Sequence, residues 1–162
     1  MAFDAVVVRP EGVWPSHDQL GQDSERGNTA TQDHFIIRDG VEFAGSHIII
    51  DLWGASHLDD LERMERAFHD VISTCGATLL HIHLHHFTPN DGISGVAVLA
   101  ESHISVHTWP ERGFAAFDVF MCGDARPELA ADVLRAYFEP TKVDVQSLRR
   151  GTVQTDSQGS NR

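Results

Sequence analysis

Three strand-like runs follow one another closely in the middle of the chain. They cover residues 93–100, 103–109 and 114–121, and only short turns separate them. β-Branched and aromatic residues recur in all three, which is typical of strands. Turns this short join antiparallel neighbours, since parallel strands need a crossover of a dozen or more residues. The spacing therefore predicts an antiparallel sheet here.

Two other segments have the periodicity of amphipathic helices. The first runs from Ser56 or His57 to about Cys75. Its apolar residues recur at steps of three and four and predict one buried stripe, made of Leu58, Leu61, Met64, Phe68 and Ile72. The second helix begins at Pro127, and Pro140 ends it.

Further apolar runs predict strands at residues 47–53, 78–86 and 142–148. We therefore predict an α+β fold: a two-layer α/β sandwich in which a mainly antiparallel sheet carries both helices on one face. Residues 34–150 would form this single domain. Residues 1–33 are largely polar and predict a mobile N-terminal extension, and residues 151–162 predict a flexible tail.

The composition narrows the class of partner. The chain has 162 residues, with 24 acidic side chains against 12 basic ones and a formal net charge of −12. This charge disfavours nucleic acid and anionic membranes as partners, and it favours cationic ligands. Two cysteines provide neither a disulfide framework nor a zinc-binding pattern. Without a recognisable signal peptide or an apolar run of membrane-spanning length, we expect a cytoplasmic protein.

The predicted strand at residues 103–109 has one polar and one apolar face. Alternation places four side chains together on the polar face: His103, Ser105, His107 and Trp109. Ile104 and Val106 point to the other face, toward the core. A Glu101-Ser102 peptide bond comes directly before this strand. The arrangement suits a serine whose hydroxyl attacks its own backbone.

Three segments together closely resemble the prokaryotic S-adenosylmethionine decarboxylases, which are pyruvoyl enzymes of polyamine synthesis. The segments are residues 87–96, 100–111 and 113–123, at nearly the spacing of that family. The likeness covers roughly residues 45–150, and the loop from Phe87 to Ser94 is one residue longer than in the best-known members. It implies a two-layer α/β sandwich, a homodimer of cleaved protomers, and a carboxy-lyase that makes decarboxylated S-adenosylmethionine for spermidine synthesis.

The resemblance also implies that the chain is a proenzyme that cuts itself between Glu101 and Ser102. The Ser102 hydroxyl attacks the Glu101 carbonyl and converts the amide into an ester. Loss of the Ser102 α-proton then eliminates the ester and leaves a pyruvoyl group. Its ketone would form a Schiff base with the substrate amine and act as the electron sink. Pyridoxal phosphate is not expected, because the chain has one lysine, Lys142, and lacks a glycine-rich phosphate loop. No metal is expected either.

Five further residues match functional positions of the family. His107 would remove the α-proton during self-cleavage, and Ser94 would hydrogen-bond the carbonyl under attack. Cys122 would return a proton to the decarboxylated carbon. Phe87 would stack on adenine, and Glu111 would hold the ribose hydroxyls.

Other functions remain open. A pyruvoyl-dependent decarboxylase of this fold can act on arginine or ornithine instead. His81, His83 and His85 share one face of a predicted strand, which is compatible with a metal-binding enzyme, although no carboxylate stands in an obvious triad with them. A catalytically silent binding or regulatory module is the third class.

Overall fold

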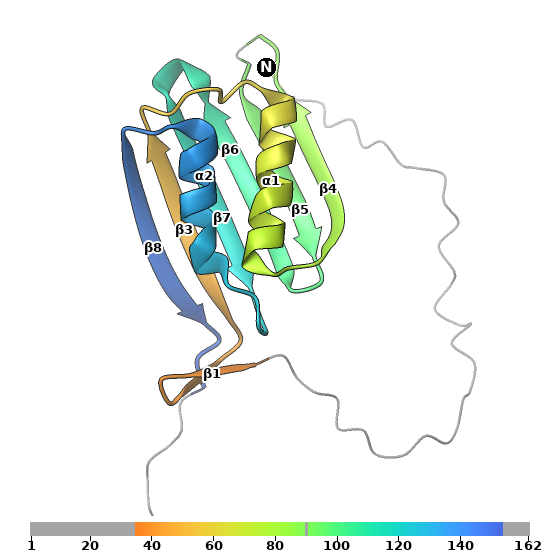
Figure 1. The fold of residues 1–162 in the computed structure, drawn as a ribbon, viewed down its shortest axis with the longest axis vertical. Coiled ribbons are helices and arrows are strands. Elements are labelled where there is room, and N and C mark those ends of the chain that lie inside the picture. The colour runs from red at the N-terminus through yellow and green to blue at the C-terminus, as the bar shows by residue number, and fades with distance from the viewer. Residues whose placement is uncertain (1–34, 90, 154–162) are drawn as a thin grey trace, which may run out of the picture. The chain divides into compact units, whose positions relative to one another are not determined.

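The computed structural model describes residues 35–89 and 91–153, and the fold is given for these residues alone. Its centre is a six-stranded sheet in the order β4-β5-β6-β7-β3-β8, in which every neighbouring pair is antiparallel (Figure 1). The strands are β3 (Gly45–Trp53), β4 (Leu79–His86), β5 (Ile93–Leu99), β6 (Ser102–Trp109), β7 (Phe114–Met121) and β8 (Lys142–Arg150). The predicted antiparallel sheet is confirmed.

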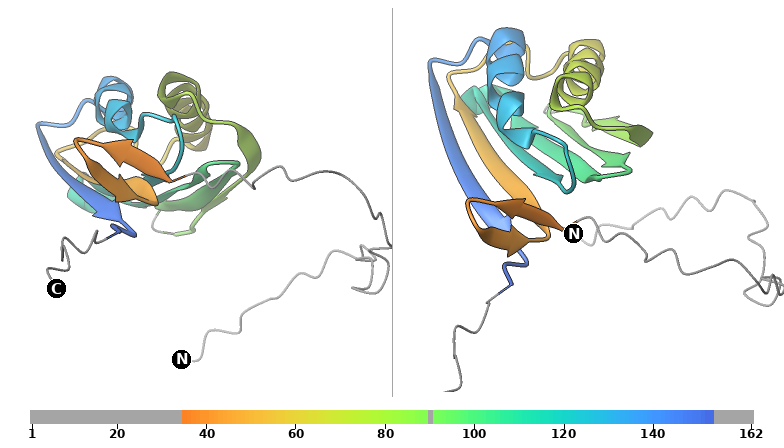
Figure 2. Two further views of the ribbon diagram at one scale, coloured as in Figure 1. Left: turned by 90° about the horizontal axis from the view of Figure 1, so that it is seen from below. Right: turned by 60° about the horizontal axis from the view of Figure 1, so that its bottom comes forward.

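Two helices, α1 (Leu61–Cys75) and α2 (Ala130–Phe138), lie on the same face of the sheet (Figure 2). A short 3₁₀ turn over Pro127–Leu129 leads into α2. The predicted two-layer α+β sandwich is therefore confirmed. In the described ranges, neither helix has the length and apolar character needed to cross a bilayer.

The core fills the space between the helices and the sheet. Its largest fully buried side chains come from both layers: Phe68, Met64, Leu134, Phe138, Ile50, Leu52, Ile104 and Phe117. Burying one such side chain contributes roughly 1.5–3 kcal/mol, so this layer supplies most of the apolar stabilisation.

The predicted start of the first helix, at Ser56 or His57, is wrong. The helix begins at Leu61, because the Asp60 side chain caps it by accepting the Arg63 backbone N–H at 2.9 Å. His57 has a φ of +61°, a left-handed conformation that a helix cannot contain. Leu61 is also exposed, whereas the other four members of the predicted apolar stripe are buried.

A short hairpin before the main sheet was missing from the sequence prediction. It pairs β1 (Ile36–Arg38) with β2 (Val41–Phe43) through an Asp39-Gly40 turn in which both residues have positive φ. Asp-Gly is a common hairpin turn, so the signal was present in the sequence. The predicted extension, residues 1–33, lies outside the described residues, as does the tail beyond residue 153.

The sheet face away from the helices is called the open face below. Among the described residues, the polar side chains on this face include His47, Asp51, His81, His83, His85, Ser94, His103, Ser105, His107 and Asp118. Trp53, Val98 and Trp109 on this face are each about 40% exposed. Ile104 and Val106 are buried on the helix side, so the predicted division of β6 into two faces is confirmed.

Candidate active site

The predicted cleavage bond lies where β6 begins, beside the end of β7. The backbone N–H of Cys122 donates to the carbonyl oxygen of Glu101 at 3.0 Å. Both residues line a cavity of about 300 Å³. A donor fixed on this oxygen would stabilise the negative charge that develops when the carbonyl is attacked.

The Glu101 turn is tied to the start of β4. One Glu101 carboxylate oxygen accepts the Thr78 backbone N–H at 2.8 Å. The Ala100 N–H donates to the Thr78 carbonyl at 3.0 Å. These contacts hold the carbonyl of residue 101 in one orientation.

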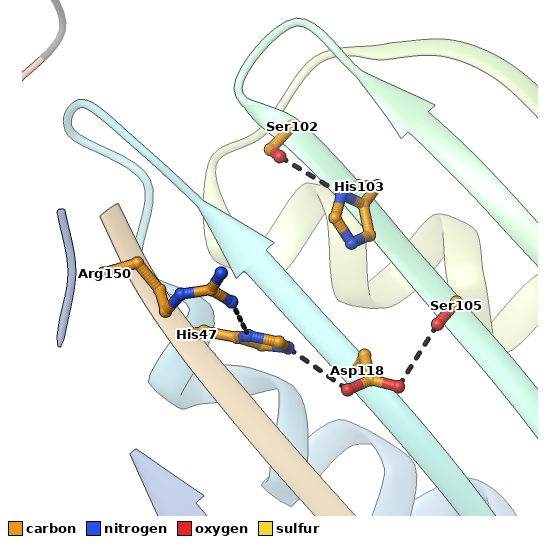
Figure 3. Close-up of polar contacts among 6 residues, drawn as sticks. All are labelled: His47, Ser102, His103, Ser105, Asp118 and Arg150. Carbon is orange, nitrogen blue, oxygen red and sulfur yellow. Dashed lines mark hydrogen bonds and ion pairs between the residues drawn. The ribbon is translucent and has the colours of Figure 1, made fainter. Parts of the chain in front are cut away.

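Ser102 has an unusual backbone conformation. Its φ is +148°, in a region that L-residues rarely adopt and that costs about 1–3 kcal/mol. The Ser102 hydroxyl lies 3.2 Å from Nδ1 of His103 (Figure 3). The residue that would react is thus strained and hydrogen-bonded to an imidazole.

A second polar chain crosses the open face next to this point (Figure 3). Asp118 lies 3.2 Å from Nε2 of His47 and accepts the Ser105 hydroxyl at 3.4 Å. The Arg150 guanidinium is 3.2 Å from Nδ1 of His47. Because arginine only donates, His47 accepts at Nδ1 and donates to Asp118 from Nε2. Asp118 is a charge in an otherwise apolar strand, a signal that sequence reasoning passed over.

The other predicted residues gather at the opposite end of β6. The Ser94 hydroxyl lies 2.7 Å from Nδ1 of His107, its partner across the β5–β6 pair. A cavity of about 270 Å³ is lined by both residues and by Phe87, Trp109 and Glu111. The structure therefore brings together four of the predicted site residues: Phe87, Ser94, His107 and Glu111.

These two ends of β6 are well separated within one chain. Ser102 and His107 are five residues apart on an extended strand, and at about 3.3 Å per residue that is roughly 16 Å. In a single protomer, His107 is therefore too far from the Ser102 α-proton to remove it. Ser94, which pairs with His107, is likewise remote from the Glu101 carbonyl.

Comparison with known proteins identifies the family of the chain. Residues 46–151 match the family model described as S-adenosylmethionine decarboxylase. The S-adenosylmethionine decarboxylase proenzyme of Thermomicrobium roseum is 44% identical over 110 residues, covering 67% of this chain and 95% of the relative. The proenzyme of Methanococcus maripaludis is 45% identical over 115 residues, covering 69% and 93%.

A solved structure extends the likeness to the fold. The crystal structure of the adenosylmethionine decarboxylase from Aquifex aeolicus matches with a TM-score of 0.62 at 34% identity. The match covers 74% of this chain and 98% of that chain. The chain belongs to the S-adenosylmethionine decarboxylase family. The predicted resemblance is confirmed.

The sequence prediction missed one structural residue of this decarboxylase, Thr108. It is buried, donates to the Leu58 carbonyl at 2.9 Å, and accepts the Ile93 N–H at 2.7 Å. Through these two bonds Thr108, which lines the Ser94–His107 cavity, connects β5 to the loop before α1. A polar residue at an inward-facing position of β6, in line with Ile104 and Val106, was the available signal.

The three alternating histidines of β4 do not converge. His81, His83 and His85 point to the open face, where alternate residues stand roughly 7 Å apart along the strand. Within residues 35–89 and 91–153, no group of three or more histidine, cysteine or acidic side chains is arranged to hold a metal ion. The decarboxylase function, and not the metal-binding alternative, is the one that the family supports.

The two cysteines of this decarboxylase lie in different environments. Cys75 is buried at the end of α1, and burial raises the pKa of its thiol to about 11. Cys122 is half-buried and lines the cavity beside Glu101. Of the two cysteines, Cys122 is the one that adjoins the predicted cleavage bond.

Proposed function

We propose that this chain is a self-cleaving proenzyme that decarboxylates S-adenosylmethionine. It cuts itself between Glu101 and Ser102. The observation that carries the proposal is the Glu101 carbonyl, held by the Cys122 N–H next to a strained serine whose hydroxyl is bonded to an imidazole. Family membership and the proenzyme names of the relatives support the same reaction.

The residues around Ser102 fit the formation and use of a pyruvoyl group. That group would supply the ketone that withdraws electrons when an amino acid loses carbon dioxide. The thiol of Cys122, a residue that lines the adjoining cavity, would hold the proton delivered to the decarboxylated carbon. A thiol can serve this role when its surroundings favour proton release near neutral pH.

The second part of the proposal is that a partner protomer completes each site. Ser94 and His107 lie roughly 16 Å from the bond they would act on, so the same chain cannot supply them. A twofold pairing of two open faces, with β6 strands running in opposite directions, would bring one protomer's His107 toward the partner's cleavage bond. The exposed Trp53, Val98 and Trp109 provide apolar surface for such an interface.

The cavity at Ser94 and His107 supports the adenosyl substrate over arginine or ornithine. Phe87 and Trp109 offer aromatic faces for adenine and for a sulfonium, which a ring attracts by about 0.5–2 kcal/mol. The Glu111 carboxylate can accept hydrogen bonds from ribose hydroxyls. Arginine and ornithine contain neither a purine nor a ribose, so these three side chains would be unused.

Intact-mass analysis of aged protein, followed by decarboxylation assays, tests the proposed function. We expect two fragments separated between residues 101 and 102, a blocked second N-terminus, and carbon dioxide release from S-adenosylmethionine well above release from arginine or ornithine. Ser102→Ala is the control and should stay intact. Wild-type protein that is folded yet permanently uncut would refute the self-cleavage, and preference for arginine or ornithine would refute the substrate.

A further inference from the structure

The imidazole nearest the reacting hydroxyl belongs to His103. We propose that His103 is the base that accepts the Ser102 hydroxyl proton when this oxygen attacks the Glu101 carbonyl. The inference rests on the proposed function, because it assigns a catalytic residue to the self-cleavage step. It separates this proton transfer from the later removal of the α-proton, for which His107 is the candidate.

Contact distances favour His103 for this role. Its Nδ1 lies 3.2 Å from the Ser102 hydroxyl oxygen, within direct hydrogen-bond reach (Figure 3). His107 of the same chain is roughly 16 Å away along the strand, and in the shared site proposed above the partner's copy serves the later removal of the α-proton. In the described part of the chain, His103 is the histidine whose ring is hydrogen-bonded to this hydroxyl.

The strained backbone of Ser102 explains how two consecutive residues meet. Successive side chains of a strand point to opposite faces, so regular geometry would direct Ser102 toward the helix layer and His103 to the open face. The φ of +148° at Ser102 breaks this alternation. The hydroxyl consequently lies beside the ring of its neighbour (Figure 3). A conformation that costs stability thus creates the contact.

The His103 ring is held from the side by a neighbouring strand. Phe120, its register partner on β7, meets the ring edge to face with centroids 5.9 Å apart. Phe120 also packs against two residues of the neighbouring strands. The His47 ring centroid lies 5.6 Å from the Phe120 ring centroid, and the Arg150 guanidinium carbon lies 5.8 Å from it. Aromatic packing limits rotation of the His103 side chain and keeps Nδ1 near the hydroxyl.

The proposed step is balanced without any other reactant. A bond forms between Ser102 Oγ and the carbonyl carbon of Glu101, while the hydroxyl proton moves to His103 Nδ1. The carbonyl π electrons move to its oxygen, which the Cys122 N–H stabilises from 3.0 Å. When the C–N bond breaks, the nitrogen takes the proton back from Nδ1. The products are an ester, a free amine and a neutral imidazole.

Hydroxylamine distinguishes the two stages, because it cleaves an ester between residues 101 and 102 but leaves the amide intact. The experiment uses full-length protein carrying His107→Ala, in which the ester should accumulate. Into this parent we would introduce His103→Ala or His103→Asn. We expect both to form the hydroxylamine-sensitive bond about 10²–10⁴-fold more slowly, the usual contribution of a positioned proton acceptor. Added imidazole should partly restore the rate in the alanine variant.

The asparagine variant separates catalysis from positioning. Its amide oxygen can still accept the Ser102 hydrogen bond but does not take up a proton near neutral pH. Ester formation at the parent rate in His103→Asn would overturn the proposal, as would a slow alanine variant that imidazole leaves unchanged. His69→Ala, on the exposed side of α1, is the matched control and should keep the parent rate.

Failure of the proposed function gives a different result. If the wild type stays uncut and the His107→Ala parent never becomes hydroxylamine-sensitive, self-cleavage itself is refuted. If the parent does become sensitive and both His103 variants match it, only the role of His103 is refuted. Circular dichroism and elution volume, compared with the parent, identify any variant that has not folded.

Discussion

The backbone N–H of Cys122 donates to the carbonyl oxygen of Glu101 at 3.0 Å. The same residue also lines the cavity beside that bond. Its backbone and its side chain can therefore serve different steps. In the proposed mechanism, the backbone N–H would serve self-cleavage by holding the carbonyl under attack, and the thiol would serve turnover of the substrate.

Cys122→Ser tests this division of roles. The substitution keeps the N–H, so we expect chain cleavage to continue, while decarboxylation falls about 10²-fold or more because the proton donor is lost. Gel analysis gives the first quantity, and carbon dioxide release by the cleaved protein gives the second. Turnover equal to wild type would remove Cys122 from the mechanism.

Coexpression of Ser102→Ala and His107→Ala chains tests whether a partner completes the site. Neither variant should form the blocked fragment by itself. In a mixed dimer, one site combines an intact Ser102 with an intact His107, so up to about half of the Ser102-bearing chains should be cleaved. Mass spectrometry of the blocked fragment measures this. The control pairs His107→Ala with a chain carrying both substitutions, and cleavage no greater than in that control would contradict the shared site.

The two thiols should differ in their reaction with iodoacetamide. Cys75 has a pKa of about 11, so at pH 8 only about one thiol in a thousand is ionised, and burial also blocks access. The thiolate of Cys75 becomes populated as pH rises toward 11. We expect one alkyl group per native chain at pH 8, located at Cys122 by peptide mapping. Labelling of Cys75 in folded protein would contradict its placement in the core.

Thr108→Val should destabilise the fold. The substitution leaves the buried Ile93 N–H and Leu58 carbonyl without partners, at a cost of about 1–3 kcal/mol. Urea unfolding of the uncut Ser102→Ala protein measures the loss. Thr141→Val is the matched control, because Thr141 also donates to a carbonyl, that of Trp53, but at an exposed position. An equal effect of the two substitutions would show that burial of Thr108 is not the cause.

Regular alternation made the sheet predictable. The strand at residues 114–121 has the predicted bounds, and the two faces of β6 follow directly from the order of its residues. The start of α1 was harder to predict from the sequence. The apolar stripe continues back to Leu58, but the positive φ of His57 and the Asp60 cap make the helix begin only at Leu61. Local propensity carries no information about such a turn.

The sequence suggested residues for the candidate site but not their geometry. Ser102 and His107 are close in sequence, yet extended backbone places them roughly 16 Å apart. The resemblance implied a homodimer, but the residues alone did not indicate which groups a second copy would contribute under the proposed shared site. The hydrogen bond between Ser102 and His103 was equally hidden, because it depends on a backbone angle that serine rarely adopts.

The strand order has a consequence for the mature protein. A cut after Glu101 would leave β3, β4 and β5 on one piece and β6, β7 and β8 on the other. In the sheet, however, β3 lies between β7 and β8, and β5 is hydrogen-bonded to β6 along its length. The strands of the two pieces therefore alternate in the sheet. The pieces could separate only if the hydrogen bonds of three strand pairs, β5–β6, β3–β7 and β3–β8, broke together. Cleavage would thus create a new chain end at residue 102 while the six-stranded sheet that positions this residue stays intact.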